Sequence, residues 1–314
     1  MEQVIQTVTG KFSVDKLNKV LMHEHIVLGY AGWFYDPKCA VFNQEEAEAQ
    51  VCERLFQLKD EGVNLIVDPC PIELGRNPEF MQVVSQKTEV NIMCSTGFDL
   101  QDRGYMSAFR GASANDISEI YLEEIENGIG PAKIKPGIIK VATGYNQITD
   151  YEMRCIEAAC IASKKTNLPI ITHTEKGTMG DEQIRAFKKF GVDPKRCIIG
   201  HCCANTDIRY HKSIFDEGCY IGYDRFGNKW HGDDYFRLAT LTALVHAGFS
   251  DRLFLGTDSV AYLLKAFPQK RDTSDWTPMY LFRYVIPELK KRGVSQEAID
   301  NMMSNNAKRF FKGE

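Results

Sequence analysis

The chain has 314 residues, 44% of them hydrophobic and 25% charged, which excludes a disordered or fibrous protein and indicates a globular one with a large core. A net charge of -4, from 38 basic and 42 acidic residues, offers no basic footprint for nucleic acid. The sequence shows no apolar run long enough to span a bilayer and no signal-peptide layout, so we expect a cytoplasmic protein with neither a membrane nor a nucleic-acid partner.

Short runs rich in β-branched residues alternate with helical patterns along the whole chain, as in parallel βα units. A hairpin over residues 4–11 is expected to cap the bottom of a barrel. Eight strands are predicted at Lys19–His25, Asn64–Asp68, Asn91–Thr96, Gly137–Ala142, Pro169–His173, Arg196–His201, Cys219–Tyr223 and Arg252–Asp258. The fold class is therefore α/β, with residues 1–314 forming one (β/α)8 TIM barrel domain.

Helices are predicted between the strands at three- and four-residue apolar spacing. They include Glu45–Glu61, Asp150–Lys165, Asp181–Phe190 and Tyr235–Ala247. Residues 261–278, a long loop after the eighth strand, lack strong periodicity and are expected to form a lid or pocket wall. Residues 279–292 and 295–311 are predicted to be the helices that close the ring.

Metal-ligand side chains gather at strand ends, where barrel enzymes hold their reacting groups. These are His23, His25, Lys140, His173, His201 and Asp258. A histidine pair at i and i+2 is ambiguous by itself, but this many imidazoles at one barrel face are costly to bury without a metal. Glu24 should point toward the helix layer and be structural, and His211, His231 and His246 have a core or surface role as the default.

Lys140 is unusual among metal ligands because an ammonium group has no lone pair. A neutral Lys140 amine that has combined with carbon dioxide would instead provide two carbamate oxygens to bridge two metals. The alternative is a salt-bridged Lys140 in a mononuclear site. Among ten scattered cysteines, Cys202 and Cys203 follow His201, so a thiolate ligand stands as an alternative to small buried residues.

The sequence resembles the phosphotriesterase-like family, and within it the lactonase branch, of the amidohydrolase superfamily. The motifs that carry the resemblance are LMHEH, GIIKVATG, ITHTEKGT, IIGHCCANTD, GYDRFG and LGTDS, in this order. The resemblance implies that His23, His25 and Asp258 bind one metal, that His173 and His201 bind the other, and that N6-carboxylated Lys140 bridges them. It also implies two divalent ions per chain, zinc first, with Co2+, Mn2+ or Fe2+ as alternatives.

A hydroxide held between two metals is a nucleophile at neutral pH, and Asp258 is the natural proton shuttle to the leaving group. The predicted function is hydrolysis of a small-molecule lactone or carboxylic ester, with phosphotriester cleavage as a weaker activity. The alternatives are an N-acyl amide hydrolase and a non-catalytic, metal-loaded binding barrel. A homodimer is compatible with the sequence, which does not determine the oligomeric state.

Substrate contacts are expected from loops at the barrel mouth. Thr96-Gly97 and Arg225 match the lactonase pattern, but Asp99 stands where those enzymes commonly have Tyr, which favours a polar substrate. Arg225 is expected either to bind a substrate carbonyl or to pair with Asp224 or Asp99. The aromatic run Tyr30, Trp33, Phe34 and Tyr35 is either a pocket wall or a loop anchor.

Overall fold

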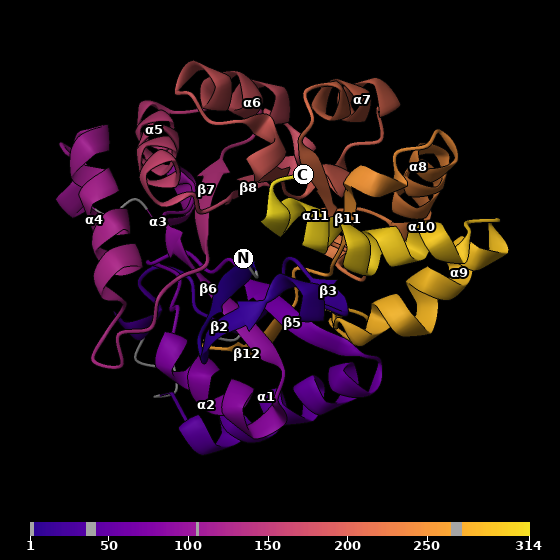
Figure 1. The fold of residues 1–314 in the computed structure, drawn as a ribbon, viewed down its shortest axis with the longest axis horizontal. Coiled ribbons are helices and arrows are strands. Elements are labelled where there is room, and N and C mark those ends of the chain that lie inside the picture. Colours follow the sequence, from indigo (N-terminus) through magenta and orange to yellow (C-terminus); the bar gives the residue numbers. More distant parts are fainter. Residues whose placement is uncertain (1–2, 36–41, 105–106, 265–271) are drawn as a thin grey trace.

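A computed structural model describes residues 3–35, 42–104, 107–264 and 272–314. Eight parallel strands curve into a nearly closed barrel in the order β11-β10-β9-β8-β7-β6-β5-β3, and helices surround it (Figure 1). These strands are β3 (Lys19–Leu21), β5 (Val63–Asp68), β6 (Asn91–Gly97), β7 (Ile138–Thr143), β8 (Ile170–Thr174), β9 (Cys197–Ile199), β10 (Tyr220–Tyr223) and β11 (Leu253–Leu255). The predicted fold class is confirmed.

The helices between the strands lie close to their predicted positions. They are α1 (Gln44–Asp60), α2 (Pro78–Thr88), α3 (Gln101–Gly104), α4 (Ala114–Asn127), α5 (Asp150–Thr166), α6 (Gly180–Lys189), α7 (Ile208–Asp216) and α8 (Asp234–His246), followed by α9 (Ile286–Lys291), α10 (Gln296–Asp300) and α11 (Asn306–Lys312). The last two predicted helices each contain a π-helical segment, at Leu281–Val285 and Asn301–Asn305. None of the helices in the described ranges combines the length and apolarity needed to cross a membrane.

Helix starts are fixed by side chains that accept the otherwise unpaired N–H groups. The Thr149 hydroxyl accepts from Glu152 N, and the Glu152 carboxylate accepts from Thr149 N, which is a complete capping box at α5. The same carboxylate also accepts from Gln101 N and Gly144 N. One buried glutamate therefore ties the start of α5 to the loops that follow β6 and β7.

Three predicted strands are shorter than the sequence pattern suggested. The first stops at Leu21, and His25 begins a separate strand, β4 (His25–Leu28). The sixth and eighth stop at Ile199 and Leu255, before their metal-ligand residues. A strand cannot continue through a left-handed residue, and both ligand residues beyond these ends have that conformation, as described below.

The segment after the eighth strand was expected to be an irregular lid, and its beginning is instead a strand. This strand, β12 (Val260–Leu263), runs parallel to β4 with Val260 opposite His25. Residues 265–271 of the expected lid lie outside the described ranges. The β4–β12 pair joins the first and last βα units above the barrel, and the ring is closed there.

The barrel interior is filled at its lower end by one apolar side chain from each strand. These are Val20, Leu65, Met93, Ile138, Ile171, Ile198, Tyr220 and Phe254. The N-terminal hairpin of β1 (Val4–Thr7) and β2 (Gly10–Ser13) adds Ile5 to this cluster, and α11 adds Phe310 and Phe311. The hairpin thus caps the bottom, as predicted, and only the opposite end of the barrel is open for chemistry.

Candidate metal centre

All six predicted ligands line one pocket at the C-terminal ends of the strands. The pocket encloses about 610 Å³, including its open mouth. Strand periodicity explains why two of these side chains are there. Lys140 follows Ile138 by two residues in β7, and His173 follows Ile171 by two residues in β8, so each points inward one layer above the apolar plug.

Two ligand residues sit on turns rather than on strands. His201 has φ 61° and Asp258 has φ 51°, both in the left-handed region. This conformation costs of the order of 1 kcal/mol or more for a residue with a side chain. Asp258 is held by a hydrogen bond from its backbone N to the His23 carbonyl, at 3.2 Å. Both turns aim the side chain back over the barrel axis.

The imidazoles and the carboxylate converge closely. Asp258 Oδ1 lies 3.6 Å from His23 Nε2 and 3.2 Å from His25 Nε2, and Asp258 Oδ2 lies 3.8 Å from His201 Nε2. The His173 and His201 ring centroids are 4.4 Å apart. Ligand atoms of His23, His201 and Asp258 all fall within 4.8 Å of one another, a spacing that a single cation could span. The donor set therefore fits a metal.

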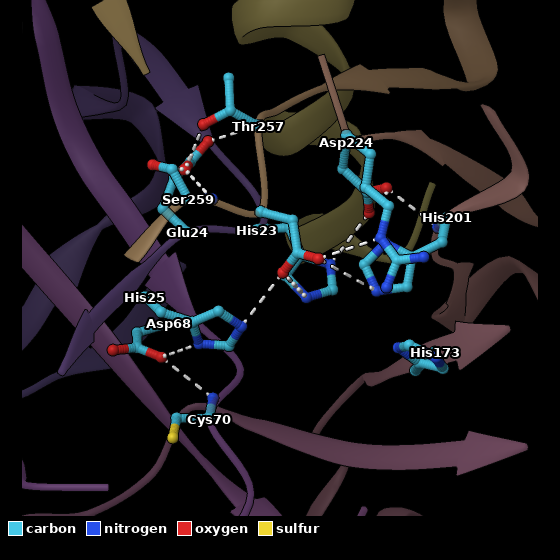
Figure 2. A network of polar contacts seen from close by, with 12 residues as sticks. His23, Glu24, His25, Asp68, Cys70, His173, His201, Asp224, Thr257 and Ser259 are labelled. Atoms are coloured by element: carbon cyan, nitrogen blue, oxygen red, sulfur yellow. Dashed lines mark hydrogen bonds and ion pairs between the residues drawn. The ribbon is translucent and has the colours of Figure 1, made fainter. Parts of the chain in front are cut away.

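Two carboxylates orient these histidines, and the sequence analysis did not assign either one to the site (Figure 2). Asp224 accepts from His23 Nδ1 and His201 Nδ1, each at 2.9 Å, and Asp68 contacts His25 Nδ1 at 3.0 Å. A carboxylate on Nδ1 fixes the ring and leaves Nε2 free for a metal. The sequence signal for Asp224 was its position directly after the strand β10, and in the structure a Cβ at Gly222 would lie 2.4 Å from Asp224 Oδ2.

A second group of ligand types, formed by His25, Asp68 and Cys70, lies beside the first. The Asp68 carboxylate is already saturated, because it accepts from Ile26 N and Cys70 N as well as contacting His25 Nδ1. Burial raises the pKa of the Cys70 thiol to about 11. This group holds His25 in place and does not offer a separate metal site.

Burial and neighbouring charge set the protonation of the site. Burial, reinforced by Arg103, lowers the pKa of His173 well below its ordinary value, and burial with Arg225 does the same for His201. Burial opposes ionisation of Asp258, yet the surrounding imidazoles, His201 first, hold its pKa well below the ordinary value. Neutral imidazoles beside an ionised carboxylate are the forms that ligate metals.

Lys140 lies at the centre of the pocket, with Nζ 3.3 Å from His23 Nε2. Burial lowers the pKa of this lysine to about 8, so roughly a tenth of the amine is neutral at pH 7. The backbone around it leaves no room, since a Cβ at Gly97 would lie 2.0 Å from the Lys140 carbonyl oxygen. The glycine of the Thr96-Gly97 motif thus lets β6 pass close to β7.

Arg225 does not make either of the ion pairs considered from the sequence. Its Nε donates to Asp258 Oδ2 at 3.0 Å, and its Nη1 lies 3.3 Å from His231 Nδ1. Asp224 is occupied by two histidines, as described above. The cation nearest to Asp99 is Arg103, whose Nη1 lies 3.7 Å from Asp99 Oδ2. Arg103 and His231 both line the pocket, and the sequence analysis assigned neither to it.

The aromatic residues divide between the two roles expected for them. Tyr30 lines the pocket, whereas Trp33 is absent from the described residues that line it. Trp33 packs against the main core, where a Cβ on Gly29 would meet its ring at 2.8 Å, so it is a loop anchor. Trp230 and Trp276 form the other pocket wall, with ring centroids 5.1 Å apart in an edge-to-face pair.

The remaining side chains near the ligands are structural. Cys202 and Cys203 are buried and do not line the pocket, and burial raises the pKa of Cys203 to about 11. Glu24 accepts hydrogen bonds from the backbone and hydroxyl groups of Thr257 and Ser259, away from the histidines (Figure 2). Both of its oxygens accept hydrogen bonds there, and it locks the turn that carries Asp258.

The model of the phosphotriesterase family matches residues 3–311. The chain belongs to the phosphotriesterase family. It is similar to an aryldialkylphosphatase of Saccharolobus solfataricus, with 32% identity over 96% of this chain and 98% of that protein. It is also similar to a phospho-furanose lactonase of Mycoplasmopsis agalactiae, with 29% identity over 99% and 92% of the two chains.

Among solved structures, a mutant PTE-like lactonase of Deinococcus radiodurans superimposes with a TM-score of 0.94. The two chains are 33% identical, and the match covers 98% of this chain and 99% of that one. Phosphotriesterase family membership confirms the resemblance described from the motifs and the predicted class of metal-dependent hydrolase.

Proposed function

We propose that this protein hydrolyses a lactone or a related carboxylic ester at a binuclear metal centre. The observation that carries the proposal is the convergence of His23, His25, His173, His201 and Asp258 around Lys140 in a single pocket. The names of its relatives, a phospho-furanose lactonase and a PTE-like lactonase, support the substrate class. The aryldialkylphosphatase among them supports phosphotriester cleavage as a second, weaker activity.

In this proposal His23, His25 and Asp258 hold one divalent cation and His173 and His201 the other. Carboxylated Lys140, whose Nζ lies 3.3 Å from His23 Nε2, would supply oxygen ligands to both cations. Zinc is the first candidate, because imidazole nitrogen and carboxylate oxygen are donors it accepts readily. When bound, such cations polarise a carbonyl oxygen and lower the pKa of water.

The chain's own residues would then handle the proton and the substrate. Asp258 accepts the proton and passes it to the leaving oxygen, and the Arg225 guanidinium, 3.0 Å away, keeps this carboxylate oriented. Trp230 and Trp276 exclude water from one side of the bound ring. Asp99 and Tyr30 line the mouth and make it polar.

A substrate panel tests the proposal. Metal-loaded protein is assayed with small lactones, acyl amides and aryl phosphotriesters, before and after prolonged chelation, and its metal content is measured. We expect close to two metals per chain and the highest kcat/KM on lactones. Faster turnover of N-acyl amides would replace the ester assignment, and metal-loaded protein without turnover of any class would indicate a binding barrel.

Two further properties remain predictions. A cytoplasmic location is consistent with the cysteines, which are free throughout the described residues. A homodimer is tested by sedimentation of the metal-loaded protein at several concentrations.

A further inference from the structure

Arg103 is a second guanidinium in the pocket, and it comes from a different loop than Arg225. It lies on α3, directly after β6, and lines the same pocket as the ligands. Its side chain is 28% exposed, so one side faces the open part of the pocket. Burial opposes its charge, but Asp99 and Glu175 raise the pKa of Arg103 above its already high value. Arg103 is therefore a permanent cation at the mouth.

The two arginines differ in how fully they are engaged. Arg225 is nearly enclosed, at 2% exposed, and donates in good geometry to Asp258. Arg103 is 3.7 Å from Asp99 Oδ2, which is too long for a hydrogen bond, and that oxygen has no hydrogen-bond partner among the described residues. Its contacts within 3.2 Å are those of Nη2 with Glu175 and His173. Within the described part of the chain, Arg103 Nε and Nη1 make no hydrogen bond, and Nη1 makes only the longer ion pair with Asp99.

The contact with His173 cannot persist beside a cation. Arg103 Nη2 lies 2.5 Å from His173 Nε2, and a positive charge on that imidazole would repel the guanidinium. Asp99 and Glu175 flank the arginine and keep it at the pocket edge.

The net charge of the pocket determines whether it favours an anionic or a cationic ligand. Arg103 and Arg225 balance the carboxylates Asp99 and Asp258, which are the charged side chains lining the pocket apart from Lys140 and the histidines. Bound divalent cations make the pocket positive, even with one carbamate. A guanidinium with free donors in such a pocket matches an oxyanion, which it can bind through two parallel N–H groups.

We propose that Arg103 binds an anionic substituent, a carboxylate or a phosphate, on the substrate ring and so makes this protein selective for anionic lactones. This inference rests on the proposed function and names its substrate class more narrowly. It also changes the role expected for Asp99. The guanidinium of Arg103 compensates the charge of Asp99, so no cation on the substrate is needed.

The test compares lactones with and without an anionic substituent, and the carboxylate and the carboxamide form a pair matched in shape. The substrates are 5-oxotetrahydrofuran-2-carboxylate, its neutral carboxamide, and the corresponding lactone with a phosphorylated hydroxymethyl group. The variants are Arg103→Gln and Arg103→Lys. The matched control is Arg209→Gln, which removes a guanidinium that is 92% exposed on α7 and paired with Asp207. Metal content is measured for each protein.

We expect the natural protein to favour at least one anionic lactone over the carboxamide by about 10- to 100-fold in kcat/KM, mainly through KM, as a lost charge-assisted pair predicts. Arg103→Gln should bring this ratio close to one, and Arg103→Lys should restore part of it. The anion with the larger ratio identifies carboxylate or phosphate as the natural group. An unchanged ratio in Arg103→Gln overturns the inference.

Binding without turnover separates this inference from the proposed function. Calorimetric titration of metal-loaded protein with tetrahydrofuran-2-carboxylate and its carboxamide needs no hydrolysis. Tighter binding of the carboxylate that is lost in Arg103→Gln and kept in Arg209→Gln supports the role of Arg103 even where no lactone is cleaved. Equal binding of both compounds by the natural protein rejects it, whereas lactone turnover alone decides the proposed function.

Discussion

The two halves of the metal centre are supported in different ways. In the half formed by His23, His25 and Asp258, both histidines have a carboxylate on Nδ1, from Asp224 or Asp68. In the other half, His201 shares Asp224, but His173 has no carboxylate on Nδ1 in the described residues and contacts Arg103 and Glu175 through Nε2. The first half is organised before any cation binds, whereas the second requires Arg103 to move. We therefore expect the halves to differ in metal affinity.

Lys140 is the side chain placed to couple the halves, and its removal should have the largest effect. Lys140→Ala should lower activity by at least about 1,000-fold, because the bridging oxygens are lost from both metals. Added acetate or propionate with metal should restore part of the activity in this variant. Lys140→Met, whose side chain fills the space, should not respond. Activity and metal content with and without the carboxylate provide the measurement, and full activity of unrescued Lys140→Ala would contradict the carbamate.

Asp258 tests the chemistry of the preorganised half. Asp258→Asn should lower kcat by about 100- to 10,000-fold, the range of a lost general base, because an amide cannot accept the proton. Metal content should fall much less, since one amide oxygen remains available. Steady-state kinetics combined with elemental analysis separate the two effects. A variant that turns over like the natural protein would require another base.

The orienting carboxylates test the comparison directly. Asp224→Asn should weaken metal binding by about 10- to 100-fold, because an amide cannot accept from both His23 and His201. Asp68→Asn should have a smaller effect, since it supports His25 alone, and Glu175→Gln on the other half should have the smallest. Competition with a fluorescent chelator measures all three. If Glu175→Gln lost as much affinity as Asp68→Asn, the two halves would be equally organised.

The smallest expected effect is on stability at the edge of the Arg103 half. Burial, with Asp99 nearby, raises the pKa of Glu73 to about 8 from an ordinary 4.5. The folded state thus holds this proton more tightly than the unfolded state, so its stability contribution is complete below pH 4.5 and is lost as pH rises toward 8. The Glu73→Gln variant does not titrate at this position, so it does not lose this stability. The difference between its melting temperature and that of the natural protein should therefore increase by roughly 3–6 °C between pH 6 and pH 8.5.

An exposed glutamate on α4 provides the control for that measurement. Glu126→Gln should show the same melting temperature difference from the natural protein at both pH values. A Glu73→Gln difference that stays constant with pH would mean that Glu73 is ionised in the folded protein across this range.

The sequence predicted the barrel and the six residues that line one pocket as proposed ligands, because both depend on local patterns. Strand-forming runs recur at regular spacing, and a histidine at a strand end is visible without knowing the fold. The conformations of His201 and Asp258 were not predictable in this way, because a two-residue period reports which residues are buried and contains no information on φ. The sixth and eighth predicted strands therefore extended through these turns.

The supporting residues were missed for a different reason. Asp224 lies 201 positions from His23 in the chain, and only barrel closure brings them to 2.9 Å. Arg103 lies in the short helix α3, where it contacts Asp99 of its own loop and Glu175, which follows β8. Asp224 and Glu175 come from other βα units than the residues they contact, so single-sequence patterns show that these residues are present but not what they do.

The apolar plug at the barrel bottom has a consequence for how the chain is made. Gln3 Nε2 donates to the Phe311 carbonyl oxygen at 2.9 Å, and Ile5 shares its cluster with Phe310 and Phe311. A nascent chain on the ribosome therefore lacks part of its plug until α11 has emerged. The same proximity makes the region between these segments a natural place to join the ends in a circular permutant, with new ends opened in an exposed surface loop.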